Sequence, residues 1–165
     1  MSESTLKGAL AEAAITAEAI RLGVVVLRPF PEGRRYDLVF DVDHRLYRVQ
    51  CKWGRCKDGV IVVYTGTCRH TPHGYVRTTY GADEIDEIAV YCEDTDQCYW
   101  LPIAEVAGRS VVHLRLTPTA NRQVIAIKYA SEYTLHGAIA QLGERCHGMA
   151  EVVGSSPTSS TSRPS

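Results

Sequence analysis

The strongest constraint on the fold is the alternation of apolar and polar residues from Tyr36 to Trp53, in the stretch YDLVFDVDHRLYRVQCKW. Runs rich in Val, Tyr and Phe on both sides of a polar turn at Asp43 and His44 predict a β-hairpin. Successive side chains of a strand point to opposite faces of a sheet. The number of residues in the turn therefore decides which side chains share a face, since a shift of one residue exchanges the faces.

An even-numbered turn would bring three polar residues together. Asp37 of the first strand would share a face with Gln50 and Lys52 of the second, while the residues between them face the other way. An acid, an amide oxygen and an ammonium group at this spacing can hold a divalent metal ion beside a phosphate group. The alternative is that Asp37 and Lys52 form a simple cross-strand ion pair, which contributes roughly 0.2–1 kcal/mol.

Asp37 followed by Gln50-x-Lys52 resembles the core of the PD-(D/E)XK nucleases. It is most similar to the branch that contains group I intron homing endonucleases, in which Gln replaces the second acid. Other motifs fit the same branch, namely Lys7-Gly8 with Glu12 on the first helix, the Arg-Pro-Phe-Pro run before the hairpin, and the later runs IDEIAVYCED, YWLP and LRLTPTANRQ. Each motif is short, so the resemblance rests on their combination.

The resemblance implies an α/β fold with a restriction-endonuclease-like core, in which helices flank a central mixed β-sheet. It also implies a metal-dependent DNA endonuclease that hydrolyses phosphodiester bonds with Mg²⁺ or alternatively Mn²⁺. Asp37, Gln50, the backbone carbonyl of Cys51 and Glu12 would ligate the metal. Lys52 would orient the attacking water and stabilise the transition state. Expected partners are double-stranded DNA and further copies of the chain, in a dimer or tetramer.

Several alternatives to these roles stay open. A junction-resolving nuclease on the same fold would cleave branched DNA in preference to a sequence site. The neutral Gln50 also allows a non-catalytic DNA-binding or assembly domain. Glu12 is alternatively a solvated helix acid, which is the usual state of Glu on a helix surface.

Composition limits the class of protein. A chain of 165 residues with 45% hydrophobic content can form one domain with a substantial core. Its formal net charge of −1 gives no overall basic signature, so DNA binding would need a local patch. Six Cys without a CxxC pair indicate reduced thiols rather than a zinc site. With no signal peptide or membrane span in the pattern, we expect a cytoplasmic protein without membrane contact.

Periodicity predicts the remaining elements of the fold. The run LKGALAEAAITAEAIRLG reads as a helix capped by Ser4 and closed by Gly23. Its expected apolar stripe consists of Leu6, Leu10, Ala13, Ala17 and Ile20. Residues 24–27 and 59–65 predict buried strands, 87–92 and 98–102 a second hairpin, IAEVAG a short helix, and 111–116 another strand. Periodicity does not decide between strand and helix for residues 123–135.

Residues 65–86 form a long connection with little hydrophobic periodicity. Long connections of this kind inside compact domains are often functional. Basic and aromatic residues suited to contacting phosphates and stacking on bases are interleaved there: Arg69, His70, His73, Tyr75, Arg77 and Tyr80. An ordinary polar surface loop is the alternative.

The composition changes at Gly137. We therefore expect a nuclease-like domain over 1–136 and a disordered tail over 137–165, ending in SSPTSSTSRPS. Codons permitted by AIAQLGER, HGM and VVGSSP fit the D-arm, anticodon loop and T-arm of an alanine transfer RNA with a GGC anticodon, so the tail is interpreted as a translated transfer RNA gene. Such a tail should make few contacts with the sheet. The nucleotide sequence tests this interpretation directly, because the coding strand must fold as a cloverleaf.

Overall fold

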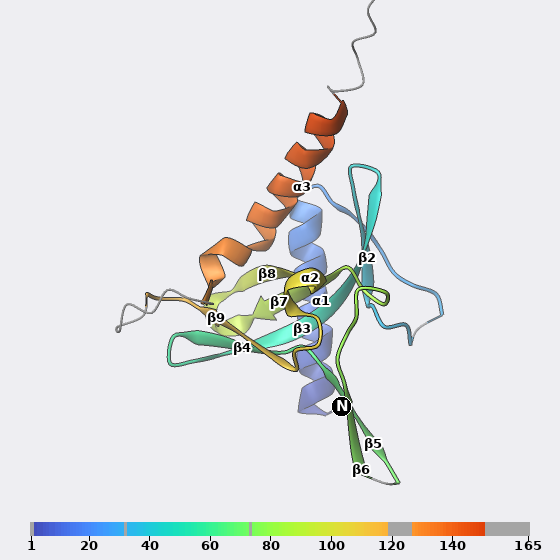
Figure 1. Ribbon diagram of the computed structural model, residues 1–165, viewed down its shortest axis with the longest axis vertical. Helices are drawn as coiled ribbons and strands as arrows, with labels where there is room; N and C mark the ends of the chain where they lie inside the picture. Colours follow the sequence, from blue (N-terminus) through green and yellow to red (C-terminus); the bar gives the residue numbers. More distant parts are fainter. Residues whose placement is uncertain (1, 32, 73, 119–126, 151–165) are drawn as a thin grey trace, which may run out of the picture.

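The computed structural model describes residues 2–31, 33–72, 74–118 and 127–150, and of 68–70 and 145–150 only the backbone. Within this part of the chain, an eight-stranded mixed sheet has helices packed against it (Figure 1). The expected α/β architecture, in which helices flank a central mixed β-sheet, is confirmed. None of the described helices is both long and apolar enough to cross a membrane.

The described helices, in chain order, are α1 (Glu3–Arg21), α2 (Ile103–Val106) and α3 (Leu135–Ala150), with short 3-10 helices η1 (Glu93–Thr95) and η2 (Ala130–Tyr133). The strands are β1 (Val25–Leu27), β2 (Leu38–Val42), β3 (Arg45–Lys57), β4 (Val60–Tyr64), β5 (Thr67–Thr71), β6 (Gly74–Thr78), β7 (Glu87–Cys92), β8 (Gln97–Pro102), β9 (Val111–Arg115) and β10 (Lys128–Tyr129). The large sheet has the order β1-β2-β3-β4-β9-β10, and β7 joins the other edge of β3 and carries β8.

The turn between β2 and β3 contains two residues. Val42 pairs with Arg45, and Asp43 and His44 between them have φ values of 48° and 67°. Two consecutive positive φ angles match a type I′ turn, whose twist suits a tight antiparallel hairpin. The even-numbered turn predicted from the sequence is therefore confirmed.

Strand β3 is the centre of the sheet because three strands pair with it. Its first part pairs with β2 over Arg45–Val49, and its last part pairs with β4 over Gly54–Lys57. On the opposite edge β7 runs parallel to Val49–Gly54. Residues 50–53 consequently have no pairing partner among the described strands on the β2/β4 edge. We call this opening the fork.

Gly54 allows β4 to approach at the end of the fork. A Cβ atom at this position would lie 2.8 Å from a methyl group of Ile61 and 3.0 Å from one of Val90. Both distances are shorter than an ordinary carbon–carbon contact. Glycine is therefore needed for close packing on this face of the sheet.

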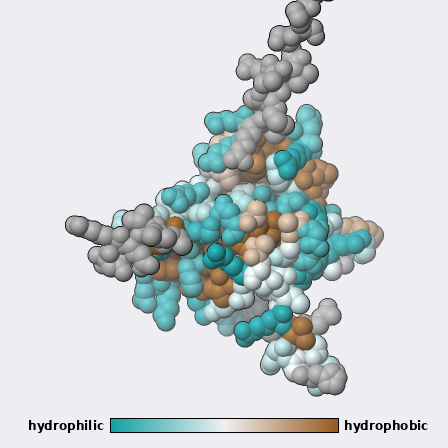
Figure 2. Space-filling model, in the orientation of Figure 1, coloured by the Kyte–Doolittle hydropathy of each residue, from teal (hydrophilic) through white to brown (hydrophobic). Residues whose placement is uncertain are grey.

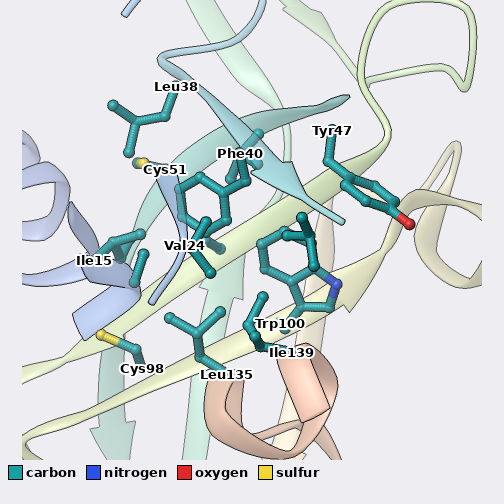
Figure 3. Packing of buried hydrophobic residues seen from close by; sticks show 14 of the residues in the cluster. Ile15, Val24, Leu38, Phe40, Tyr47, Cys51, Cys98, Trp100, Leu135 and Ile139 are labelled. Atoms are coloured by element: carbon teal, nitrogen blue, oxygen red, sulfur yellow. The ribbon is translucent and has the colours of Figure 1, made fainter. Parts of the chain in front are cut away.

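Two hydrophobic layers cover the two faces of the sheet. Under α1 and α3, the rings of Phe40 and Trp100 stack with centroids 5.4 Å apart, surrounded by Ile15, Leu38, Leu135 and others (Figure 3). The second layer lies against α2 and contains buried residues such as Ile61, Ile85, Ile88, Val90, Leu101 and Leu114. The apolar surface visible in Figure 2 is broken into small patches among hydrophilic residues.

Helix α1 differs from its prediction in both its cap and its buried face. Ser2, not Ser4, caps the helix, since its side chain accepts a hydrogen bond from the backbone N–H of Thr5 at 3.2 Å. Gly23 closes the helix with a φ of 80°, as expected. Every member of the predicted apolar stripe is exposed, namely Leu6, Leu10, Ala13, Ala17 and Ile20.

 The face of α1 that packs against the sheet carries Ala11, Ile15 and Ala19, which are spaced four residues apart. All three residues are buried. Alanine on both sides of Ile15 lets the helix lie close to the strands. The larger apolar residues Leu6, Leu10 and Ile20 are exposed. The predicted stripe is wrong because the buried face is set by the fit of small residues around Ile15 against the strands, which the hydrophobicity of Leu6, Leu10 and Ile20 does not reveal.

Strand β1 is an edge strand rather than the buried strand expected from residues 24–27. Val25 and Leu27 are 59% and 45% exposed, and in the described residues the strand pairs only with β2. Only Val24, which precedes the strand, is buried, at 6% exposure. Strand β4, by contrast, lies between β3 and β9 as predicted for an interior strand.

Residues 65–86 are not an irregular connection. They contain the hairpin β5–β6, a separate two-stranded sheet that projects from the body of the domain (Figure 1). Tyr75, Val76, Arg77 and Thr78 of β6 are all exposed. Because successive residues of this strand meet solvent, the hairpin lacks the alternating pattern by which strands are recognised.

The chain after β6 follows its prediction closely. The β7–β8 hairpin, α2 and β9 form where expected. The undecided segment 123–135 contains β10, which is parallel to β9, followed by η2, while 119–126 lie outside the described residues. Cys92 pairs with Gln97 and Cys98 with Tyr91, so the two thiols belong to different hydrophobic layers and both are free.

Helix α3 contradicts the expectation that the chain is disordered from Gly137 and makes few contacts with the sheet. Residues 137–150 continue this helix, and Leu135 and Ile139 are 1% and 9% exposed within the layer around Trp100 (Figure 3). Ala138 and Leu142 pack against the same layer. Apolar residues at helical spacing explain the packing. Residues 151–165 lie outside the described residues, and the transfer RNA origin of the tail stays a prediction.

Replacement of Ile139 by Ala tests the contribution of α3 to stability. The lost side chain is largely buried, so we expect the free energy of unfolding to fall by about 2 kcal/mol. Urea denaturation followed by circular dichroism measures the change. Gln141→Ala, on the exposed side of the helix, is the matched control and should change stability by less than about 0.5 kcal/mol. Equal stability of the Ile139 variant and the wild type would contradict the packing role.

Glu87 is a buried acid between the sheet and α3. It is 8% exposed, and its Oε2 atom has no hydrogen-bond partner in the described part of the chain. It lines a cavity of about 350 Å³ together with Trp100, Gln141 and Leu142. Burial, together with the negative charges of Asp86 and Glu105, raises the pKa of Glu87 to about 8.

The ionisation of Glu87 should make stability depend on pH. Between its ordinary pKa of 4.5 and its folded value of about 8, the unfolded chain releases the proton first, so stability falls as pH rises. Glu87→Gln removes this loss, and we expect it to stabilise the protein at pH 8 by on the order of 2 kcal/mol. The gain should vanish near pH 4. Thermal unfolding of the variant and the wild type at both pH values measures this gain in stability. A gain independent of pH would contradict the role of Glu87 ionisation.

Candidate active site

Asp37 occupies the entrance to the fork, immediately before β2. Its backbone N–H donates to the carbonyl of Val49 at 2.9 Å, which extends the β2–β3 pairing by one residue. Its side-chain Oδ2 accepts a hydrogen bond from the backbone N–H of Cys51, also at 2.9 Å. The carboxylate thus satisfies a strand N–H that β2 no longer reaches, and this bond fixes the position of the acid.

Gln50 lies beside Asp37 on the same face of the hairpin. Its Nε2 atom donates to Asp37 Oδ2 at 2.5 Å and to the carbonyl oxygen of Cys51 at 3.3 Å. The side chain is 8% exposed. The convergence of an acid and an amide predicted from the alternation is therefore present, and the carbonyl of Cys51 joins it.

Lys52 completes this face, where its Nζ atom donates to the hydroxyl of Tyr80 at 3.1 Å. Burial lowers the pKa of Lys52, and the negative charge of Asp37 partly offsets this effect. Conversely, burial raises the pKa of Asp37, opposed by the hydrogen bond from Cys51 and by the positive charges of Lys52 and Arg28. Two partly desolvated groups of opposite charge consequently lie near each other at the fork.

Glu12 approaches the fork from α1. Its carboxylate lies 3.6 Å from a guanidinium nitrogen of Arg28, and its side chain is 32% exposed. Burial raises the pKa of the Cys51 thiol well above its ordinary value, and the charges of Asp37 and Glu12 raise it further. The structure joins Asp37, Gln50 and the backbone of Cys51 through hydrogen bonds, and Glu12 on α1 forms an ion pair with Arg28.

The donor atoms at the fork suit a hard cation. Asp37, Glu12, the Gln50 amide and the Cys51 carbonyl offer oxygen ligands, which Mg²⁺ prefers. The Gln50 amide nitrogen now lies on two of these oxygens, and rotation of the amide by half a turn would place its oxygen there instead. No group of three His, Cys, Asp or Glu side chains suited to a metal occurs in the described ranges. A metal at the fork would thus need the amide and carbonyl oxygens.

A hollow beside Lys52 leads away from the fork. This cavity of about 530 Å³ is lined by residues of the α1 N-terminus, including Ser4 and Lys7, and by Trp53, Arg55 and Gly66 among others. Gly66 immediately precedes β5, so the hollow reaches the base of the projecting hairpin. Lys7, Lys52 and Arg55 give it three cationic side chains against the single acid Glu3.

The residues predicted to contact DNA divide into different environments. Tyr80 is 4% exposed, so it is buried rather than presented for stacking on a base, and its contact with DNA stays a prediction. Tyr75 is 75% exposed and Arg77 is exposed, both on β6. Arg69 and His70 lie on β5, with only their backbone described, and His73 lies outside the described residues.

Sequence reasoning missed the residues that surround Tyr80. The guanidinium of Arg35 lies 4.3 Å from the centroid of the Tyr80 ring and makes two hydrogen bonds to the Glu84 carboxylate, at 2.8 and 3.1 Å. Arg35 also donates to the carbonyl of Thr79 at 3.0 Å. No local pattern links positions so far apart in the chain. The only available signal was the position of Arg35 two residues before Asp37.

Comparison with known proteins identifies the class. The family model for PD-(D/E)XK endonucleases matches residues 2–136, and the chain belongs to this family of nucleases. The solved structure of a bacterial homing endonuclease, I-Ssp6803I, is similar with a TM-score of 0.71 and 28% sequence identity, over 92% of this chain and 99% of that chain. No curated protein matches the chain. The family resemblance expected from the sequence is confirmed.

Substitution of Gln50 by Glu tests whether the fork holds a metal. An added negative charge beside Asp37 should raise the affinity for Mn²⁺ roughly tenfold, because it strengthens the Coulomb attraction. Asp37→Asn should lower it. Calorimetric titration without DNA measures both variants, and identical affinities of all three proteins would place the metal elsewhere.

Proposed function

We propose that this protein is a metal-dependent DNA endonuclease that hydrolyses phosphodiester bonds in double-stranded DNA, with Mg²⁺ as its cofactor and Mn²⁺ as an alternative. The observation that carries the proposal is the convergence of Asp37, Gln50 and the Cys51 carbonyl on the open edge of β3. Lys52 lies on the same face of the hairpin. Membership of the PD-(D/E)XK family supports this function.

The roles follow from the chemistry of the groups. Asp37, Gln50, Cys51 through its carbonyl, and Glu12 would hold the metal, which would supply polarisation of the scissile phosphate and a lowered pKa of a water molecule. Lys52 orients the attacking water and neutralises charge that develops on the phosphate. Gln50 is neutral, so the site has one negative charge fewer than a site with two acids on the hairpin. We expect DNA phosphates to contribute to metal binding for this reason.

DNA is proposed to lie along the hollow beside Lys52 and to contact the β5–β6 hairpin. Lys7 and Arg55 offer cations to phosphates, and the exposed Tyr75 and Arg77 extend the same surface. Arg69, His70 and His73 belong to the same hairpin segment and are proposed to assist. The similar structure is that of a homing endonuclease. A homing role and assembly as a dimer or tetramer are accordingly part of the proposal.

Cleavage assays with Asp37→Ala and Lys52→Ala test the mechanism. Each variant should lose at least about 100-fold in rate, because each removes a charge that acts on the scissile phosphate. Purified protein is incubated with linear and branched DNA, with Mg²⁺ or with a chelator. The matched controls are Asp41→Ala and Lys57→Ala. They remove an acid from β2 and a cation from β3, both away from the fork.

The outcomes separate the alternatives. Preference for branched DNA would identify a junction-resolving nuclease on the same fold. DNA binding without cleavage under every metal condition would identify a binding or assembly domain. Unimpaired cleavage by Asp37→Ala would remove the proposed metal site.

A further inference from the structure

We infer that Tyr80 is a positioning residue for Lys52, and that Arg35 and Glu84 hold Tyr80 in place. The inference rests on the proposed nuclease function, because it gives Lys52 its task. Tyr80 lies 28 residues from Lys52 in the chain, yet its hydroxyl is 3.1 Å from the lysine Nζ atom. It belongs to the segment between β6 and β7, outside the hairpin that carries the site.

Lys52 needs an external partner because its side chain is long and flexible. A lysine ammonium has three donors on a stem of four carbons and loses considerable rotamer entropy when it is fixed. The Nζ atom lies 5.1 Å from the centroid of the Tyr80 ring and 3.1 Å from its oxygen, so the ammonium is near the hydroxyl end of the ring. The phenol oxygen thereby accepts one of its hydrogen bonds.

Tyr80 is itself held by further contacts. Its ring is 4% exposed, in the hydrophobic layer under α2. Arg35 lies over the ring, and the Glu84 carboxylate fixes Arg35 through two hydrogen bonds. Glu84 is in turn anchored by the backbone N–H of Gly81, at 3.2 Å. These contacts form a continuous series from Glu84 through Arg35 and Tyr80 to Lys52.

The hydroxyl group of Tyr80 distinguishes a positioning role from a packing role. A residue that only filled the core would need the ring and not an oxygen beside an ammonium group. Burial raises the pKa of Tyr80 to about 12, so the phenol stays neutral and does not take the charge of Lys52. A neutral acceptor fixes the ammonium without the strong attraction that would hold it away from a phosphate.

Tyr80→Phe tests the inference, since it keeps the ring under Arg35 and removes the oxygen. Single-turnover cleavage at saturating protein should slow about tenfold, as expected for loss of a hydrogen bond to a charged group. The dissociation constant for DNA, measured by gel shift, should change less than twofold. Tyr91→Phe is the matched control, because it also loses a tyrosine hydrogen bond, to Asp96, on another part of the sheet. It should cleave at the wild-type rate.

A readout without DNA separates this inference from the proposed function. Acylation of lysines by a small reagent, followed by mass spectrometry, should proceed severalfold faster at Lys52 in Tyr80→Phe, while the rate at Lys128 stays the same. Arg35→Met should likewise slow cleavage and speed the acylation of Lys52. This variant replaces Tyr80→Phe if Tyr80→Phe does not fold.

Each outcome has one meaning. Unchanged acylation of Lys52 together with wild-type cleavage would overturn the positioning role and leave the nuclease function intact. Faster acylation in a protein that cleaves no DNA would uphold the contact and overturn the nuclease function. Weaker DNA binding with an unchanged single-turnover rate would assign Tyr80 to binding, which also overturns the inference.

Discussion

The site depends on the hydrogen-bonding requirement of the peptide groups of β3. Where β2 and β4 separate, the N–H of Cys51 loses its strand partner, and a buried N–H without a partner costs free energy. Asp37 supplies the missing acceptor with its side chain. The same hydrogen bond therefore completes the sheet and places the acid. Gly54 then lets the second part of β3 pair with β4, so the opening stays confined to a few residues.

Burial at the fork raises the pKa of Asp37 and lowers the pKa of Lys52. Asp37 and Lys52 are each disfavoured in their charged forms by burial, and each favours the charged form of the other. Removal of one alone would leave the other short of its counter-charge. Such a site is less stable than an apolar one, because an acid and a lysine are kept partly desolvated beside each other.

The sequence predicted the hairpin and its face correctly because alternation and a two-residue turn are local properties. It failed where packing was decided by distant partners. The face of α1 depends on how closely a helix can lie against strands, which favours Ala11 and Ala19 over larger neighbours. The link between Arg35 and Glu84 joins segments far apart in the chain. The composition of α3 suggested disorder, yet a few apolar residues at helical spacing, among them Ile139, suffice to bind it to the sheet.

Because the turn at Asp43 and His44 has two residues, the face that Asp37 occupies depends on the number of residues in the hairpin as well as on their identity. Both residues lie at the end of the hairpin away from the fork, and other residues able to adopt positive φ could replace them. One inserted residue that shifted the register would instead move Asp37 to the face of the hydrophobic layer, where an ionised acid is strongly disfavoured. Related genes should thus tolerate substitutions in this turn and exclude single-codon insertions and deletions, a pattern that natural variation in the DNA would display.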